Sequence, residues 1–228
     1  MSKPFAWSWS ALDAYEQCPR RYHLTKVIKA FPEQQNAQML EGQKFHRALE
    51  LRVDRGKTLP KEYAYCEPIV QRLQQAAQGG TMIAERKIGI TRDLKECEFF
   101  DKAVWLRTVV DCQIDKGYNA MVLDWKTGKK KTGYDQLALT AAVKFALQPD
   151  LRQVTTAYVY FSDPDPVVKE TFVRDDAPGI WQNMLPRVGK IEDSLAKDYW
   201  PPKQSGLCRA HCPCINCEFN GQNPKNGG

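Results

Sequence analysis

The hydrophobic and polar positions of the chain repeat with a helical period at both ends and with a strand period in the middle. This pattern predicts helices at residues 10–28, 38–55, 63–78, 134–147 and 177–197. It predicts strands, rich in β-branched and aromatic residues, at 82–91, 104–115, 120–125, 154–161 and, at an edge, 167–173. A helical portion followed by three strands, a helix and a further strand indicates an α/β fold.

Single residues mark where several of these elements begin, bend or end. Ser8 or Ser10 can cap the first helix, because a serine hydroxyl accepts a hydrogen bond from a free backbone N–H of the first turn. Cys18-Pro19 predicts a kink in that helix or its division into two short helices, since proline interrupts the helical hydrogen bonds. Gly56 is expected to end the second helix.

The order of these elements predicts a single domain over residues 1–228. Its expected parts are a helical N-terminal portion (1–80), a core (81–175), a helix with a linker (176–204) and a cysteine-rich cap (205–228). The cap has almost no apolar residues besides its cysteines, so it is not expected to pack a core of its own. Residues 220–228 are expected to fray.

Composition limits the class of protein only broadly. The 228 residues are 43% hydrophobic, which is enough for a sizeable core, and the formal net charge of +6 suits a polyanionic partner. No stretch approaches the roughly 20 apolar residues of a membrane span, and no signal peptide is visible, so a soluble, cytoplasmic protein without a membrane partner is expected. Four of the eight cysteines lie within residues 208–217, and crowded thiols in a reducing compartment suggest a metal.

Two carboxylates and a lysine lie at the ends of two consecutive predicted strands. Asp111 lies near the end of one, and Asp124-Trp125-Lys126 ends the next, before a break at Thr127-Gly128. If the strands pair, the two carboxylates converge where Mg²⁺ could bind, since this ion takes carboxylates, water and phosphate oxygens. Strand alternation puts Lys126 on the same face as Asp124. A metal that activates water beside a fixed cation is typical of phosphodiester cleavage.

These residues occur together with other motifs in one order along the chain. The motifs are Cys18-Pro19-Arg20-Arg21-Tyr22, Gly42-Gln43-Lys44-Phe45-His46, Asp111, Asp124-Trp125-Lys126-Thr127-Gly128, Gln136 and the terminal cysteines. In this order the sequence resembles the PD-(D/E)XK nuclease superfamily, in particular its RecB-type branch of CRISPR-associated exonucleases and bacteriophage recombination nucleases. The resemblance implies a restriction-endonuclease-like core and metal-dependent cleavage of DNA in a bacterium or a phage-infected cell.

The resemblance also implies roles for the residues of the site. The expected ligands of Mg²⁺ or Mn²⁺ are His46, Asp111, Asp124 and the backbone carbonyl of Trp125. An imidazole ligand favours Mn²⁺ relative to an all-oxygen site. Lys126 is expected to stabilise charge on the phosphate, and Gln136 to contact the substrate and support the site. The tyrosine of the family's Q-x-x-x-Y motif is missing, because Thr140 stands in its place.

Other charged residues near these motifs have weaker expectations. Asp115 is expected in a solvated turn. Glu85 stands where some relatives place another acid near the metal, and a surface position suits it equally well. Lys129, Lys130 and Lys131 are expected in a solvated loop close enough to the site to contact backbone phosphates.

The cysteines have two open interpretations. RecB-type nucleases often join their two chain ends through a four-iron four-sulfur cluster, and the resemblance assigns such a cluster to Cys18, Cys208, Cys212 and Cys217. Cys214 is then a spare thiol. The alternative is a zinc site made by the tail alone, from Cys208, Cys212, Cys214 and Cys217, with or without His211.

The resemblance implies a metal-dependent exonuclease that acts in DNA processing or recombination. One alternative is an endonuclease or a CRISPR-type enzyme that trims DNA ends. Another is a catalytically inert DNA-binding module on the same fold, which the intact acids and lysine disfavour. DNA is the expected partner, and a recombinase, a helicase or a single-strand-binding protein could deliver it.

Overall fold

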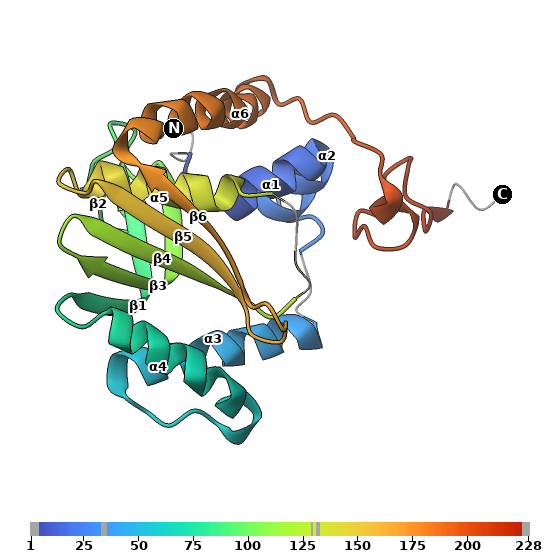
Figure 1. Ribbon diagram of the computed structural model, residues 1–228. Coiled ribbons are helices and arrows are strands. Elements are labelled where there is room, and N and C mark those ends of the chain that lie inside the picture. Colours follow the sequence, from blue (N-terminus) through green and yellow to red (C-terminus); the bar gives the residue numbers. More distant parts are fainter. Residues whose placement is uncertain (1–4, 33–35, 129, 131–132, 225–228) are drawn as a thin grey trace. The chain divides into compact units, whose positions relative to one another are not determined.

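The structure is a computed structural model that describes residues 5–32, 36–128, 130 and 133–224 (Figure 1). The chain forms two compact units. The first comprises Met1–Ala6 and Asn36–Met184, and the second comprises Trp7–Gln35 and Leu185–Gly228. The first unit is therefore built mainly from one continuous stretch of chain, and the second from two stretches that are far apart in sequence.

A six-stranded sheet forms the centre of the first unit (Figure 1). The strands lie in the order β2-β1-β3-β4-β5-β6, with the bounds β1 Thr81–Ile90, β2 Glu96–Cys97, β3 Leu106–Lys116, β4 Asn119–Lys126, β5 Gln153–Tyr160 and β6 Val167–Val173. Neighbouring strands pair antiparallel except β4 and β5, which are parallel. A parallel pair needs a crossover connection, and the helix α5 (Asp135–Leu147) provides it.

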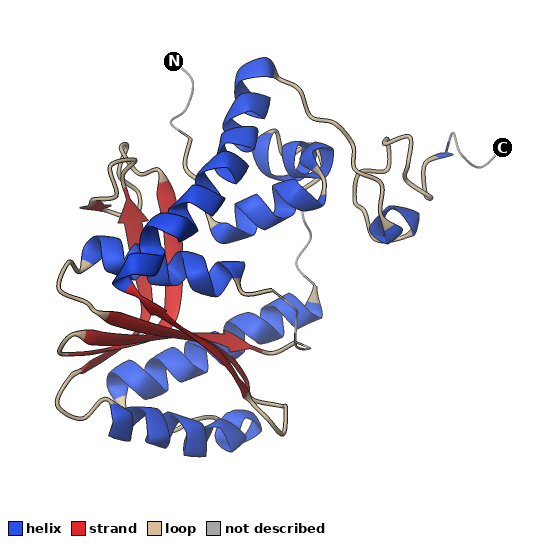
Figure 2. Cartoon of the chain, turned by 45° about the horizontal axis from the view of Figure 1, so that its top comes forward, coloured by secondary structure: helices blue, strands red, loops and turns tan. Residues whose placement is uncertain are grey.

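Helices cover both faces of this sheet (Figure 2). On one face, α3 (Ala37–Arg55) packs against β1 and β3, and α4 (Glu67–Ala76) lies beside it after the short helix η2 (Lys61–Cys66). On the other face, α5 packs against β4 and β5. The core under α3 is formed by the buried side chains of Phe45, Leu49, Leu59, Tyr63, Cys66, Val70, Cys112, Leu123, Trp125, Ala157, Val159 and Phe161. This core fixes α3 on the sheet.

The second unit combines the N-terminal helices with the C-terminal part of the chain. Its helices are α1 (Trp9–Gln17), α2 (Pro19–Tyr22), the π-helix η1 (His23–Val27) and the part of α6 (Ala177–Lys197) that follows Met184. The hydroxyl of Tyr15 donates a hydrogen bond of 2.9 Å to the carbonyl of Lys190. Arg187 donates two hydrogen bonds of 2.7 Å to the carboxylate of Glu16. Polar contacts thus join α1 to α6.

The C-terminal tail is held by two asparagine side chains. Asn220 is 1% exposed, and its amide donates to the carbonyls of Cys212 and Cys214 at 2.9 and 3.1 Å. Asn223 donates in the same way to the carbonyl of Cys217 at 2.9 Å. The expected fraying from residue 220 is therefore wrong up to residue 224. A count of apolar residues misses these amides, which satisfy buried backbone carbonyls.

The predicted strands are confirmed with differences at their ends, and so are the predicted helices, except that the helix expected over 63–78 begins as the 3₁₀ helix η2 and becomes α-helical only in α4. Ser8 caps α1 by accepting a hydrogen bond of 3.2 Å from the backbone N–H of Ala11. Gly56 ends α3 with a φ of +64°, a left-handed conformation that glycine adopts without steric cost. The helix predicted over 10–28 is divided into α1, α2 and η1, with the break at Cys18.

The sequence pattern does not predict β2, because a strand of two residues is too short to show a period. Two further 3₁₀ helices are present in the described part of the chain, η3 (Arg174–Asp176) and η4 (Gly206–Arg209). Within the described ranges, none of the helices is both long and apolar enough to cross a membrane.

Candidate metal and catalytic site

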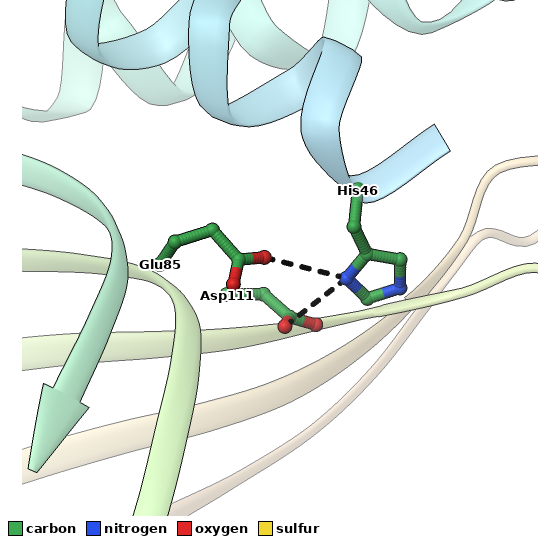
Figure 3. A group of neighbouring side chains, drawn as sticks. All are labelled: His46, Glu85 and Asp111. Atoms are coloured by element: carbon green, nitrogen blue, oxygen red, sulfur yellow. Dashed lines mark hydrogen bonds and ion pairs between the residues drawn. The ribbon is translucent and has the colours of Figure 1, made fainter. Parts of the chain in front are cut away.

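Three side chains from three elements of the first unit converge (Figure 3). His46 comes from α3, Glu85 from β1 and Asp111 from β3. Nδ1 of His46 lies 3.2 Å from Oδ1 of Asp111 and 3.6 Å from Oε1 of Glu85. The three atoms all lie within 4.8 Å of one another, so a nitrogen and two carboxylate oxygens could bind one cation.

The backbone of β1 changes conformation at Glu85. The residues on either side pair with β3 in one regular register, but Glu85 itself has a φ of +47°. This left-handed conformation costs a glutamate about 1–3 kcal/mol, and such strain collects at functional sites. The adjacent backbone is held by α3, because Oδ1 of Asp54 accepts a hydrogen bond of 2.9 Å from the N–H of Ala84. α3 therefore supplies both His46 and an anchor for the strand that carries Glu85.

Asp111 also connects β3 with the end of β4. The regular pairing of these strands ends at Cys112 and Leu123. Beyond it, Oδ2 of Asp111 accepts a hydrogen bond of 2.6 Å from the backbone N–H of Trp125. A side chain thus replaces the backbone acceptor at this point, and the other oxygen of the carboxylate faces His46.

Asp124, Lys126 and Gln136 form a second polar group in the same unit. Nζ of Lys126 lies 2.5 Å from Oδ2 of Asp124. Gln136, in the first turn of α5, donates to Oδ1 of Asp124 at 2.8 Å and accepts from Lys126 at 3.5 Å. The structure thus brings the acid, the lysine and the amide of the sequence motifs together.

Negative charge exceeds positive charge around these side chains. Burial lowers the pKa of His46, but the hydrogen bonds and charges of Asp111 and Glu85 outweigh it and raise that pKa to about 10. Burial, followed by repulsion from Asp111, raises the pKa of Asp124 to about 6 against the attraction of Lys126. A divalent cation would relieve the repulsion and replace the proton on His46.

The donor atoms around His46 fit a divalent cation. Neighbouring ligands of an octahedral ion, with bonds of about 2.1 Å, lie roughly 3 Å apart, which is close to both separations from Nδ1 of His46. One imidazole and two carboxylates suit Mn²⁺ as well as Mg²⁺. Asp124 is not in this group of three, since Lys126 and Gln136 hold its carboxylate. Its metal-binding role and that of the Trp125 carbonyl stay predictions.

An open groove of about 530 Å³ leads to the cluster. It is lined by the three residues of the cluster and by Met39, Gly42, Gln43, Arg47 and Glu50 of α3. Gly42 of α3 lies near the loop after β4, and a Cβ at this position would make an ordinary van der Waals contact of 3.9 Å with Oγ1 of Thr127. The groove has the size of a ligand site, and one face of α3 forms most of its wall.

Asp115 is not in a solvated turn, and that prediction is wrong. It lies within β3 and accepts hydrogen bonds from Lys144 at 2.8 Å, from Gln113 at 3.0 Å and from Gln148 at 3.3 Å. Lys144, on α5, is fully buried. No local pattern connects residues that are 29 positions apart, so the sequence does not reveal this ion pair.

Glu85 is the functional candidate that sequence reasoning left open. Its one sequence signal is that β1 contains no other acid, its remaining residues being apolar, basic, threonine or glycine. Of the lysines predicted in a solvated loop, Lys129 and Lys131 lie outside the described residues. Lys130 pairs with Asp163 at 2.9 Å.

Cys18 lies with the C-terminal tail in the second unit. Its sulfur accepts a hydrogen bond of 3.4 Å from the backbone N–H of Lys203. The neighbouring Arg20 forms an ion pair with Glu218 and lies 4.0 Å from the sulfur of Cys217. The N-terminal cysteine motif therefore contacts both ends of the tail segment.

Cys214 is the most buried of the tail cysteines. Burial, followed by the neighbouring thiols of Cys212, Cys18 and Cys217, raises its pKa to about 12. The sulfur of Cys208 accepts a hydrogen bond of 3.5 Å from the backbone N–H of Ser205. Cys18, Cys212 and Cys217 thus lie near Cys214, but among the described residues no three cysteines are close enough together to form a metal-binding group as His46, Glu85 and Asp111 do.

Comparison with known proteins gives one family. The chain matches the PD-(D/E)XK nuclease superfamily over residues 6–217. A solved structure titled "Crystal structure of SSO0001" is similar to this chain at 11% identity and a TM-score of 0.43, and the similarity covers 96% of this chain and 89% of that chain. No curated protein matches the chain.

Proposed function

The chain belongs to the PD-(D/E)XK nuclease superfamily, and on this basis we propose that it is a divalent-metal-dependent deoxyribonuclease. Its six-stranded sheet with helices on both faces is the α/β core of that superfamily. The convergence of His46, Glu85 and Asp111 carries the proposal, and Asp124, which is paired with Lys126, is near enough to interact with the charges of Asp111 and His46. Together these side chains offer the metal ligands and the fixed cation that phosphodiester hydrolysis needs.

Each side chain has its own part in the proposed reaction. His46, Glu85, Asp111 and Asp124 would hold the ion. Bound Mg²⁺ or Mn²⁺ supplies an acidified water and offsets charge on the phosphate. Lys126 provides a point charge for the negative charge that builds on the phosphate in the transition state. Gln136 orients Asp124 and Lys126 through the two ends of its amide.

Exonucleolytic cleavage of DNA, as in the RecB-type branch, is the proposed mode. The open groove along α3 and the net charge of +6 support a polyanionic strand as substrate. An endonuclease is the alternative, since an open groove also accepts a strand without an end. Delivery of the strand by a recombinase, a helicase or a single-strand-binding protein is compatible with either mode.

The proposal is tested with purified protein, Mn²⁺ and linear or circular DNA, each single- and double-stranded. An exonuclease degrades linear DNA and leaves circles intact, whereas cleavage of circles identifies an endonuclease. Asp124→Ala, purified in the same way, controls for contaminating nuclease. A protein that leaves all four substrates intact would be the inert DNA-binding module instead.

We further propose that the second unit holds a four-iron four-sulfur cluster on Cys18, Cys208, Cys212 and Cys217. The position of Cys18 beside the tail supports a site that includes both ends of the chain. Cys214 is the spare thiol in this assignment, although it lies near the thiols of Cys212, Cys18 and Cys217. The cluster would anchor a tail that has little apolar surface.

Anaerobic purification tests this second proposal. The protein should be brown, since thiolate-bound iron-sulfur clusters absorb visible light, and Cys18→Ala should lose the colour while Cys214→Ala keeps it. Colourless protein with one zinc per chain would contradict it if Cys18→Ala retains the zinc and Cys214→Ala loses it. That result would establish the zinc site of the tail and leave the nuclease site unaffected.

A further inference from the structure

Tyr158 of β5 lies beside the site although no sequence motif includes it. β5 runs parallel to β4, and in their register Tyr158 stands opposite Asp124. Lys126 lies two residues further along β4, so strand alternation puts it on the same face as Asp124, diagonal to Tyr158. The parallel order of the two strands thus places an aromatic side chain next to the catalytic lysine.

Two contacts connect Tyr158 with the polar groups of the site. Nζ of Lys126 lies 4.8 Å from the centre of the Tyr158 ring, within the roughly 6 Å of a cation–π interaction. The Tyr158 hydroxyl donates to Oε1 of Gln136 at 3.4 Å, and the same oxygen accepts from Lys126 at 3.5 Å. Both hydrogen bonds are long and therefore weak, so Tyr158 contacts Lys126 through its ring more strongly than it contacts Gln136 through its hydroxyl.

The surroundings of Tyr158 keep its ring in place. The side chain is 5% exposed and belongs to a small core with Leu137 and Tyr160. The ring of Tyr160 meets it edge to face, with centroids 6.2 Å apart. Thr140, one turn after Gln136, donates a hydrogen bond of 2.8 Å from its hydroxyl to the Gln136 carbonyl. The side chain at the position of the family's tyrosine thus binds the backbone of its own helix.

We propose that Tyr158 is a positioning residue, which holds the ammonium of Lys126 with its ring and the amide of Gln136 with its hydroxyl. A lysine side chain has four rotatable bonds, and a fixed position for its ammonium removes an entropic cost from the transition state. The ring and the carboxylate of Asp124 together restrict where Nζ lies. This inference rests on the proposed nuclease function and adds a residue to it.

Two substitutions separate the ring from the hydroxyl. Tyr158→Phe removes the hydroxyl alone, and Tyr158→Leu removes both groups. Phe145→Leu removes another buried ring, on α5, and controls for lost packing. With DNA and saturating Mn²⁺, kcat should fall roughly 10²-fold in Tyr158→Leu at nearly constant KM, because misplacing a catalytic group by about 1 Å has this effect. Tyr158→Phe should lose only about threefold.

Equal kcat values for Tyr158→Leu and the Phe145→Leu control, both folded, would overturn the proposal. A Tyr158→Phe variant as slow as Tyr158→Leu would overturn the role of the ring. The contact between the Tyr158 ring and the Lys126 side chain is measured separately, by NMR on lysine-labelled protein. The ring current should move the ε-CH₂ signal of Lys126, assigned with Lys126→Ala, upfield in the wild type and in Tyr158→Phe.

The NMR measurement needs neither activity nor a folded Tyr158→Leu variant. An unshifted Lys126 signal in the wild-type protein would overturn the proposal whatever the activity. A shifted signal in a protein that cleaves no DNA would contradict the proposed function and leave the ring contact standing.

Discussion

Asp111 and Asp115 lie on the same strand, β3, and have opposite electrostatic surroundings. Asp115 is paired with the buried ammonium of Lys144 and with two glutamine amides. Asp111 shares its surroundings with Glu85 and Asp124, next to a groove that is open to solvent. The first carboxylate is paired with a lysine and two amides of the protein, whereas the second shares one imidazole with another carboxylate. The partners of an acid, rather than its presence in a strand, distinguish a site from a structural ion pair.

The basic partners of Asp115 and Asp111, which are Lys144 and His46, differ in the direction in which their pKa values are shifted. Burial lowers the pKa of Lys144, and the single carboxylate of Asp115 does not offset it. Burial also lowers the pKa of His46, but Asp111 and Glu85 together raise it to about 10. Two carboxylates around one imidazole hold more negative charge than a proton alone balances, and such an excess favours a divalent cation.

The largest expected effect is on cleavage. Asp111→Ala, Asp124→Ala and Lys126→Ala should each reduce kcat by roughly 10³-fold or more, because each removes stabilisation that the transition state needs. DNA binding, measured by filter retention, should weaken only modestly in Lys126→Ala, since many phosphate contacts share that energy. Full activity in any of the three would remove the site assignment.

The matching change at Asp115 should affect stability instead. Asp115→Ala leaves Lys144 buried without its carboxylate and should lower the free energy of unfolding by about 3 kcal/mol, measured by urea denaturation. Cleavage should persist at temperatures where the variant is folded. The double variant Asp115→Leu/Lys144→Leu is the control and should recover most of the stability. An equal loss of stability in Asp111→Ala would remove the distinction between the two acids.

The next effect concerns metal affinity. His46→Ala should raise the Mn²⁺ concentration for half-maximal activity about tenfold or more and retain activity at saturating metal, because the carboxylates remain. Lys44→Ala changes an exposed residue of the same helix and should leave the titration unchanged. An unchanged titration in His46→Ala would return the imidazole to a structural role.

The smallest expected effect is a difference in stability between two variants of Glu85, which separates the backbone strain at this position from the role of its carboxylate. Glu85→Gly and Glu85→Ala both remove the carboxylate and should weaken Mn²⁺ binding equally. Because glycine adopts a φ of +47° without strain, Glu85→Gly should be about 1 kcal/mol more stable than Glu85→Ala in urea denaturation. Equal stability of the two variants would show that the backbone at this position is not strained.

Much of the fold could be predicted from the sequence because its signals are local. Ser8 marks a helix start through the hydrogen bond that its hydroxyl accepts, and Gly56 marks a helix end because a residue without a side chain adopts a positive φ freely. The alternation along β3 and β4 likewise depends only on neighbouring residues. By contrast, the order of the tail could not be predicted. Asn220 and Asn223 are held by the carbonyls of Cys212, Cys214 and Cys217, and these contacts depend on how residues 212–217 fold back, which no local pattern shows.

The site could be predicted as far as its motifs extend. His46, Asp111, Asp124, Lys126 and Gln136 belong to motifs. The structure brings His46 and Asp111 into one group and Asp124, Lys126 and Gln136 into another. Glu85 reaches its position through a backbone angle, Tyr158 through a parallel strand order, and Lys144 through the packing of α5 on the sheet. These three properties depend on the completed fold, and no spacing in the sequence encodes them.

The discontinuous second unit also has a consequence for synthesis on the ribosome. Glu16 meets its partner Arg187 only after a separation of 171 residues, which takes roughly 10–30 s to translate. His46, Asp124 and Gln136 all lie in the continuous part of the first unit. The strands and helices that carry the candidate site are therefore synthesised, and can begin to pair, before the first helices of the chain have met Arg187.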